Sequence, residues 1–533
     1  MKPLYSSIRA SFSKDVYMAI CPVIAAPTVV FEVKNAKDLA VMTSETPPQN
    51  VILPVASDLT VAGEPLYDVL AKCSRCVPIL YIADEATVAP LSEFCDFNHV
   101  GDAILCAAYE DRAILAKAYS AMQMLRGMLD CRGTTPEIEK LPAIAVANGA
   151  TSVILDEKMA TADAVHSLQQ RFIHIISAGS FGTLATRGVN GIITPEPEKA
   201  YSFLSGFPEG TVLRRRNLLA HKGFQNNGMY SENTITSVVA AAKNYFDGAE
   251  IDVKLTSDDV AVVMHNTNTK GLFDCEVAVT EESSYEFLSS LRRIEHPTET
   301  IDKFSDLMHE MKQYPDTPVL IEIKPSAKYH KVELLTAMTD ELLRDGLSQE
   351  NCIGIMGGSL GPGLKYVHKR IPYLPLGWCE GGKNIPAAPE NREEAEDRLY
   401  RIAQLTEGCA AGYNPEDVNI NRLFNEYAKF RMLHVFVWSR SWTLSPSKWE
   451  ENGPSNDNTY LSGFDAWTTD HGEKFLDLPI SIDGDGKLCF RDGHKESAAC
   501  EKLTVGDEVF FLYNIELHFG GKYYICSEPI ICK

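Results

Sequence analysis

Short apolar runs alternate with amphipathic segments along most of the chain. In the first part the apolar runs predict strands, and the segments between them carry apolar residues at helical spacing. The predicted strands are Asn50–Val55, Val77–Ile82, Ala103–Cys106, Ser152–Leu155, Phe172–Ile176 and Gly191–Thr194, with helices over segments such as Asp111–Leu129 and Thr161–Arg171. This alternation is typical of α/β folds with a parallel sheet.

The second part repeats the rhythm more clearly. Its strand candidates are Asn217–His221, Ala249–Val253, Ala261–His265, Val319–Lys324, Cys352–Met356, Tyr373–Gly377, Leu433–Trp438 and Phe464–Thr469. Helical patterns lie between several of them, at Thr234–Phe246, Thr300–Lys312, Lys331–Arg344 and Asn391–Leu405. Eight strands in this arrangement predict a closed (β/α)8 TIM barrel, whose functional residues lie at the carboxyl ends of the strands.

A short internal echo suggests that the chain holds two barrel-like halves. Gly188–Pro197 resembles Ser462–His471, because in both segments apolar residues lead into Thr-Pro or Thr-Asp. After Pro479 the pattern changes to short alternating segments that follow the hairpin-turn sequence Asp483–Gly486. We therefore predict a degenerate, non-catalytic barrel-like α/β domain at residues 1–206, a TIM barrel at 207–478 and a small β-rich domain at 479–533.

Composition and charge narrow the classes of function. The formal net charge of −22 over 533 residues disfavours nucleic acid and anionic membranes as partners. The longest apolar stretch, Val16–Phe31, is interrupted by prolines and predicts a buried strand or a loop rather than a membrane span. The scattered cysteines include one CxxC pair, Cys73 and Cys76, and predict buried free thiols in a reducing, cytoplasmic compartment.

The most informative local pattern is Gly248–Val253. Glu250 and Asp252 alternate with apolar residues, so both carboxylates lie on one face of the predicted strand. In a parallel barrel strand that face is normally apolar, and two buried carboxylates are costly unless a cation lies between them. Oxygen ligands of this kind suit Mg²⁺ or Ca²⁺. The alternative interpretation is an exposed edge strand with solvated acids.

Three neighbouring strand candidates end in polar residues at comparable positions. His221 and His265 each close an apolar run, and Glu322 and Lys324 alternate on one face of Val319–Lys324. Each feature alone is ordinary, but together they break the expected core pattern on four successive strands, which indicates a site. Between the first two strands, Ser231 or Asn233 could cap the helix that follows, and capping alone would explain why these residues stand there.

This inventory suits cleavage of a phosphodiester. Three carboxylates can hold a divalent cation that neutralises phosphate charge and polarises a phosphoryl oxygen. His221 and His265 can serve as general acid and general base. Lys222 and Lys324 can balance the charge of the non-bridging oxygens.

The set of motifs resembles the glycerophosphodiester phosphodiesterase family, whose fold is a TIM barrel of the phospholipase C-like kind. The matching segments are Ala220–Gly223, Glu232–Thr234, Glu250–Asp258, Val262–His265, Glu322–Lys324, Val435–Trp438 and Ala466–Asp470. Order and spacing both agree, over about residues 214–478.

The resemblance implies a hydrolase that cleaves a glycerol phosphodiester to glycerol 3-phosphate and an alcohol, with attack by the neighbouring glycerol hydroxyl as one mechanism. It implies that Glu250, Asp252 and Glu322 bind the metal and that the two histidines form the acid/base pair. Lys324 would then face the phosphate, and Trp438 would form a wall of the substrate pocket. The implied partner is a small-molecule diester.

Two residues depart from the family pattern. Lys222 stands where the family usually has Arg, which keeps the charge but loses the bidentate fork. Asn266 stands where the family usually has Asp, so the side chain still accepts a hydrogen bond but carries no charge. These departures leave open a catalytically weak barrel that binds a phosphodiester or a metal, and a phospholipase D-like enzyme acting on lysolipids.

Overall fold

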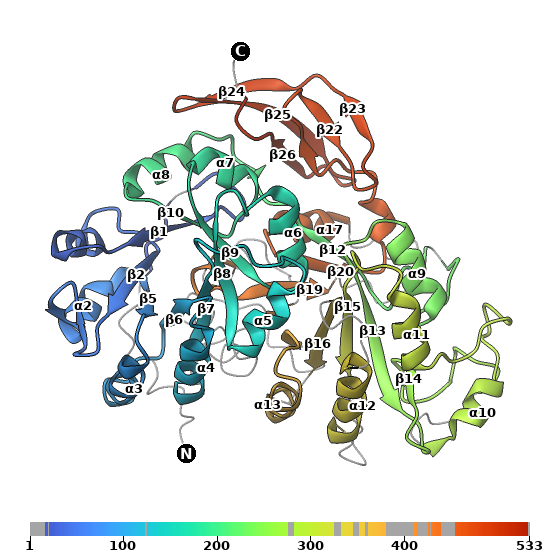
Figure 1. Cartoon of the computed structure of the whole chain (residues 1–533). Coiled ribbons are helices and arrows are strands. Elements are labelled where there is room, and N and C mark those ends of the chain that lie inside the picture. The colour runs from blue at the N-terminus through green and yellow to red at the C-terminus, as the bar shows by residue number, and fades with distance from the viewer. Residues whose placement is uncertain are drawn as a thin grey trace.

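The computed structural model describes residues 16–19, 21–122, 125–226, 228–275, 282–324, 332–344, 351–357, 361–379, 410–413, 425–426, 428–438 and 453–530. Two eight-stranded parallel barrels account for most of them, and they lie side by side (Figure 1). A smaller β-rich segment follows at the carboxyl end of the chain.

The first barrel closes in the order β1-β10-β9-β8-β7-β6-β5-β2, with β1 pairing to β2. Its strands are β1 (Thr28–Glu32), β2 (Asn50–Val55), β5 (Val77–Ile82), β6 (Ile104–Ala108), β7 (Arg126–Asp130), β8 (Ala150–Asp156), β9 (His174–Ala178) and β10 (Gly191–Ile193). Its helices are α2 (Leu66–Lys72), α3 (Val88–Phe97), α4 (Arg112–Ala121), α5 (Leu141–Ala147), α6 (Ala162–Gln170), α7 (Phe181–Thr186) and α8 (Pro197–Ser205).

The second barrel has the TIM-barrel α/β fold. Its ring consists of β12 (Asn217–Ala220), β13 (Gly248–Leu255), β15 (Val319–Ile323), β16 (Cys352–Gly357), β17 (Leu376–Cys379), β18 (Ala410–Tyr413), β19 (His434–Trp438) and β20 (Ala466–Thr469). Helices α9 (Ile235–Lys243), α10 (Tyr285–Ser290), α11 (Phe304–Met311), α12 (Val332–Arg344), α13 (Gly361–Arg370) and α17 (Gly453–Leu461) belong to the same part of the chain. The predicted helix Asn391–Leu405 lies outside the described residues.

One of the eight predicted ring strands is wrong. The segment predicted at Ala261–His265 forms β14 (Ala261–Val263), which pairs antiparallel with β13 and lies outside the ring. The physical reason is the short connection from Leu255 to Ala261, because a parallel crossover needs a dozen or more residues. The eighth strand of the ring is instead β18, which lies between β17 and β19 and was not predicted from the sequence.

The prediction missed one strand of the first barrel, β7. The helix predicted over Asp111–Leu129 ends at Ala121, and β7 begins at Arg126. Leu125, Met128 and Leu129 continue the helical spacing of apolar residues, so periodicity alone did not reveal the break. The segment Val16–Phe31, predicted as a buried strand or a loop, contains the first four residues of β1, all of which are buried.

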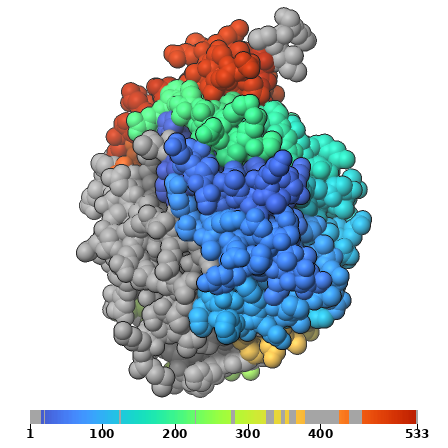
Figure 2. Space-filling model, turned by 90° about the vertical axis from the view of Figure 1, so that its left-hand side faces the viewer, coloured from blue at the N-terminus to red at the C-terminus, as the bar shows by residue number. Residues whose placement is uncertain are grey.

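The carboxyl-terminal segment is all β and pairs with the linker between the barrels. One sheet has the order β11-β26-β25-β24, with β11 (Thr211–Val212), β24 (Glu501–Val505), β25 (Glu508–Glu516) and β26 (Lys522–Cys526). A second sheet contains β21 (Ser481–Ile482), β22 (Lys487–Cys489) and β23 (Lys495–Ser497), and the predicted turn Asp483–Gly486 joins its first two strands. Figure 2 shows this segment above the face that the first barrel forms.

Both segments of the internal echo form the last strand of a ring, β10 in the first barrel and β20 in the second. The division into three domains stays a prediction. Cys73 and Cys76 are buried free thiols, as expected. In the described part of the chain, no helix combines the length and apolar character needed to cross a membrane.

The two barrels dock through the amino ends of their strands. Phe172, directly before β9, packs in one cluster with side chains of the second barrel. These partners are Leu219, Leu320, Ile353, Ile355, Phe436 and Ala466. The Phe172 ring is stacked on Phe436 with centroids 5.2 Å apart. Phe172 therefore fills the base of the second barrel.

Buried polar contacts surround this aromatic plug. Asp102 of the first barrel accepts hydrogen bonds from Arg126 at 2.8 Å and from Arg431, just before β19, at 2.7 Å. Nearby, Asn50 Nδ2 donates to the carbonyl oxygen of Phe430 at 2.8 Å. Because Arg431 and the side chain of Asn50 make these contacts only when the two bases meet, the contacts fix one orientation of the barrels.

Replacing Phe172 by Ala should therefore destabilise the protein by about 3–5 kcal/mol, since it empties the base of the second barrel. The measurement is urea denaturation followed by tryptophan fluorescence. Phe97→Ala is the control, because Phe97 is 85% exposed and its loss should change the free energy of unfolding by less than about 0.5 kcal/mol. Equal urea midpoints of unfolding for the two variants would show that Phe172 does not stabilise the base of the second barrel.

Candidate active site

The three predicted carboxylates meet inside the second barrel. Every residue of β13 is buried, and Glu250 and Asp252 are each only 1% exposed. On the neighbouring strand β15, Glu322 lies directly beside Asp252 in register. One carboxylate oxygen from each of the three residues lies within 4.8 Å of the others. The alternative of an exposed edge strand is therefore wrong, because β13 lies between β12 and β15.

Lys324 partly neutralises this group. Its Nζ lies 3.2 Å from Asp252 Oδ1 and 2.5 Å from Glu322 Oε1. Burial alone would lower the pKa of Lys324, but the surrounding carboxylates raise it well above its usual value. One ammonium cannot balance three carboxylates, so the cluster keeps an excess of negative charge.

The crowding of acids in this cluster shows clearly in the pKa of Glu250. Burial, and then the charge of Asp252, raises the pKa of Glu250 well above its usual value. Burial would also raise the pKa of Asp252, but Lys324 and His265 outweigh it and lower that pKa. Glu250 Oε2 accepts a hydrogen bond from the backbone N–H of Lys222 at 3.0 Å, while the buried Oε1 has no hydrogen-bond partner among the described residues. An oxygen in this position is suited to binding a cation.

His221 follows β12 and lies at the rim of the carboxylate group. Its Nδ1 is 2.7 Å from Asp470 Oδ1, and its Nε2 is 3.9 Å from Glu250 Oε2. Burial lowers the pKa of His221, but attraction to Asp470 and Glu250 outweighs this effect and raises it to about 9. Asp470 thus fixes the ring and leaves Nε2 directed at the carboxylates.

His265 reaches the same level from the antiparallel side. β14 runs back along β13, and the N–H of Met264 donates to the carbonyl oxygen of Asp252 at 2.8 Å. His265 Nδ1 lies 2.9 Å from Asn266 Oδ1, so the amide oxygen can accept the Nδ1 hydrogen. Burial lowers the pKa of His265, although the charge of Asp252 acts in the opposite direction.

Asn233 supports the site directly instead of capping a helix. Its Nδ2 donates to Asp252 Oδ2 at 2.8 Å, and its Oδ1 accepts from the N–H of Asp252 at 2.9 Å. The cap of α9 is Thr234, whose hydroxyl accepts from the N–H of Ser237 at 3.1 Å. The expectation that Ser231 or Asn233 caps this helix is therefore wrong.

The remaining predicted residues lie near the same rim. Lys222 Nζ is 3.2 Å from both carboxylate oxygens of Glu232. Trp438 is the last residue of β19, at the carboxyl end of the ring, and its side chain lies outside the described residues. The sequence pattern predicted no role for Asp470 and only a helix cap for Asn233. The signal for Asp470 was present, because a polar residue directly after a barrel strand lies at the functional end.

Comparison with known proteins gives a match over part of this barrel. Residues 221–348 match the model of the glycerophosphoryl diester phosphodiesterase family. Over those residues the chain is similar to members of this family. The matched range includes both histidines and all three carboxylates described above.

Individual relatives are more distant. An uncharacterized protein of Mycoplasma genitalium, MG293, is 37% identical over 79 residues, which are 15% of this chain and 30% of that protein. The match therefore spans less than a third of this curated relative.

Solved structures of similar fold cover about half of the chain. A glycerophosphodiester phosphodiesterase from Parabacteroides distasonis is 16% identical, with coverage of 49% of this chain and 94% of that one and a TM-score of 0.38. An Oleispira antarctica phosphodiesterase, solved with the product sn-glycerol-3-phosphate, is 20% identical, with coverage of 49% and 95% and a TM-score of 0.38. A Thermotoga maritima glycerophosphodiester phosphodiesterase is 19% identical, with coverage of 49% and 98% and a TM-score of 0.34.

In metal-free protein, Asp470→Asn should lower the pKa of His221 from about 9 toward its ordinary value of about 6.5. The folded-state pKa of His221 is raised, so its stabilisation is complete below about pH 6.5 and is lost as pH rises through about 9. The variant should lose much of this pH-dependent stability.

The measurement is an NMR titration of the histidine ring signals in the presence of a chelator, with His221→Gln to assign the resonance. Asp316→Asn serves as the control, because Asp316 is an exposed carboxylate of the same barrel. An unchanged His221 titration in Asp470→Asn would show that Asp470 does not set this pKa.

Proposed function

We propose that the second barrel is a metal-dependent phosphodiesterase that hydrolyses a glycerophosphodiester to glycerol 3-phosphate and an alcohol. The observation that carries the proposal is the meeting of three carboxylates, two of them buried and the third partly buried, with two histidines at one end of the barrel. Each histidine has its Nδ1 beside an acceptor oxygen, which leaves Nε2 for proton transfer.

Glu250, Asp252 and Glu322 are the residues that would hold the metal. The fit is supported by the unpartnered Oε1 of Glu250 and by the excess of negative charge that Lys324 does not balance. An all-oxygen ligand set suits Mg²⁺ or Ca²⁺. When bound, such an ion neutralises phosphate charge and polarises a phosphoryl oxygen.

The two histidines would transfer protons on opposite sides of the phosphorus. One accepts the proton of the glycerol hydroxyl that neighbours the phosphate, and this oxygen attacks phosphorus. The other donates a proton to the leaving alkoxide, so an alcohol departs and a cyclic phosphate forms. Addition of water to the cyclic phosphate, with the proton transfers reversed, gives glycerol 3-phosphate.

Positive side chains would position the diester. Lys324 lies beside Asp252 and Glu322, and Lys222 is near enough for its charge to lower the pKa of Asp252, so both would face a bound phosphate. Trp438 ends the strand that would form a pocket wall. Asn266 keeps the acceptor contact to His265 without adding charge. Lys222 and Asn266, the two departures from the family pattern, thus keep a positioning role. We expect them to lower the rate of the reaction without changing its type.

The first barrel would have no catalytic part in this reaction. At its carboxyl end, Arg132 forms ion pairs with Asp130 at 2.7 Å and with Glu32 at 2.8 Å. Both carboxylates are therefore engaged by one guanidinium. We propose that this barrel serves to close the base of the second barrel through Phe172.

Purified protein with Mg²⁺ or Ca²⁺ should release glycerol 3-phosphate from at least one soluble glycerophosphodiester. Chelation should abolish turnover, and His221→Ala or His265→Ala should lower kcat by about 10²–10⁴-fold, as for loss of an acid/base group. The measurement is enzyme-coupled detection of glycerol 3-phosphate across diesters with choline, ethanolamine, glycerol and inositol alcohols.

His309→Ala is the matched control, because His309 is an exposed histidine of α11 in the same barrel and should keep full activity. Folded protein that binds metal and diester without turnover would refute the enzyme and favour a binding protein. Turnover confined to micellar lysolipids would refute the soluble-diester substrate and favour the lipid-acting alternative.

A further inference from the structure

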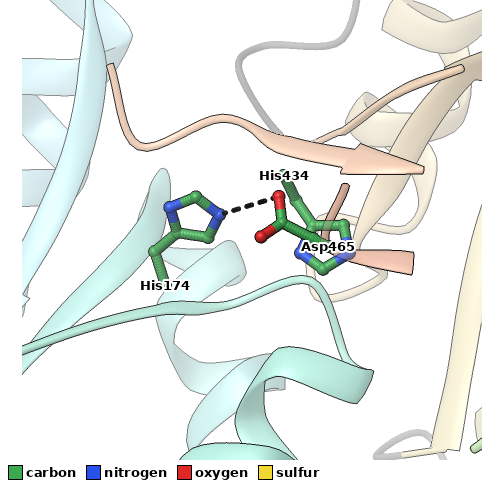
Figure 3. A group of neighbouring side chains, drawn as sticks. All are labelled: His174, His434 and Asp465. Atoms are coloured by element: carbon green, nitrogen blue, oxygen red, sulfur yellow. Dashed lines mark ion pairs between the residues drawn. The ribbon is translucent and has the colours of Figure 1, made fainter. Parts of the chain in front are cut away.

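A second group of metal-ligating side chains lies where the two barrels meet. His174 is the first residue of β9 in the first barrel, and His434 is the first residue of β19 in the second. Asp465 directly precedes β20. Figure 3 shows the three side chains pointing toward one another, with His174 contributed by one barrel and the other two residues by its neighbour.

The two imidazoles are buried without hydrogen-bond partners. His174 is 1% exposed and His434 is fully buried. Neither ring nitrogen of either histidine has a hydrogen-bond partner among the described residues. Buried polar groups are nearly always paired, so four unpaired nitrogens at one place require an explanation.

The ligand atoms of the cluster are close enough to share one ion. One atom from each residue lies within 4.8 Å of the others, and His174 Nε2 is 3.8 Å from Asp465 Oδ2. Arg214 pairs with the opposite oxygen, Oδ1, at 2.7 Å. The N–H of Val435 donates to Oδ2 at 2.8 Å, which leaves a further lone pair on that oxygen.

The surroundings hold these ligands in place. The ring of Phe172 is stacked on that of His434, with centroids 4.3 Å apart. Arg214, which pairs with the carboxylate of Asp465, gives the kind of outer-shell support that orients metal ligands.

We propose that His174, His434 and Asp465 form a Zn²⁺ site that joins the two barrels. Two imidazoles and one carboxylate are ligands that zinc prefers, whereas Mg²⁺ and Ca²⁺ prefer an all-oxygen set. The site lies at the amino ends of the strands, opposite the proposed active site, so its role is to hold the barrels together. The inference does not rest on the proposed phosphodiesterase function.

The test uses the full chain with the carboxylate site disabled by Glu250→Gln and Asp252→Asn. After equilibration with Zn²⁺ and removal of the excess, elemental analysis should find one zinc per chain. Adding His174→Gln or His434→Gln should weaken zinc affinity by at least about 100-fold, more than the loss of an outer-shell partner costs. His309→Gln, which removes an exposed histidine, should leave affinity unchanged.

X-ray absorption of the zinc-loaded background variant gives a measurement that does not depend on the histidine variants folding. It should show imidazole ligands with Zn–N distances of about 2.0–2.1 Å. Failure to bind zinc, equal binding by the histidine variants, or a spectrum without imidazole would each overturn the proposal. Loss of phosphodiester turnover would not bear on it, because the background variant already lacks the carboxylate site.

Discussion

The insertion of Phe172 into the base of the second barrel is the contact on which the arrangement of the molecule depends. Side chains on alternate positions of a barrel strand face the interior, so Leu320 and Glu322 lie one above the other on β15. Phe172 packs against the lower of these two positions, and the carboxylate site begins at the upper one. The first barrel therefore supplies part of the apolar floor beneath the charged residues. A dry floor limits the solvent that reaches Glu250 and is consistent with the raised pKa of that side chain.

Buried charges around this floor fix how the parts of the chain meet. Asp247, directly before β13, lies 2.9 Å from His166 of α6 and 2.5 Å from Arg215 of the linker, and it also pairs with Arg491 of the carboxyl-terminal segment. The N–H of Leu218 donates to the same carboxylate at 2.8 Å. Burial would raise the pKa of Asp247, but the cations outweigh this effect and lower it. One carboxylate thus connects both barrels, the linker and the carboxyl-terminal segment. Losing both Arg215 and Arg491 would leave this desolvated charge without a cation, which costs several kcal/mol.

How much could be predicted from the sequence depended on whether a feature was local. Alternation by two placed Glu250 and Asp252 on one face of β13, and the structure finds them there. Contacts between distant residues had no such signal, since His221 and Asp470 are 249 positions apart. Phe172 likewise gave no signal of its distant contacts, because its local sequence predicts the start of a strand, whereas its side chain packs in the other barrel. For β14, the apolar residues correctly predicted a strand, but the predicted parallel direction of that strand was wrong. Connection length, rather than periodicity, distinguishes a parallel neighbour from an antiparallel one.

The antiparallel direction of β14 also explains how His265, which follows that strand, reaches the carboxylates. A parallel strand would have carried His265 upward, away from Asp252, whereas β14 returns along β13 and brings it level with that residue. The two proposed cation sites then lie at opposite ends of one barrel and differ in ligand chemistry. The carboxyl ends of the strands gather oxygen ligands, and the amino ends gather imidazoles across the junction with the first barrel. Hard cations prefer the first set and zinc prefers the second. Ligand type alone can therefore direct different ions to the two places, so that one supports chemistry while the other secures the floor beneath it.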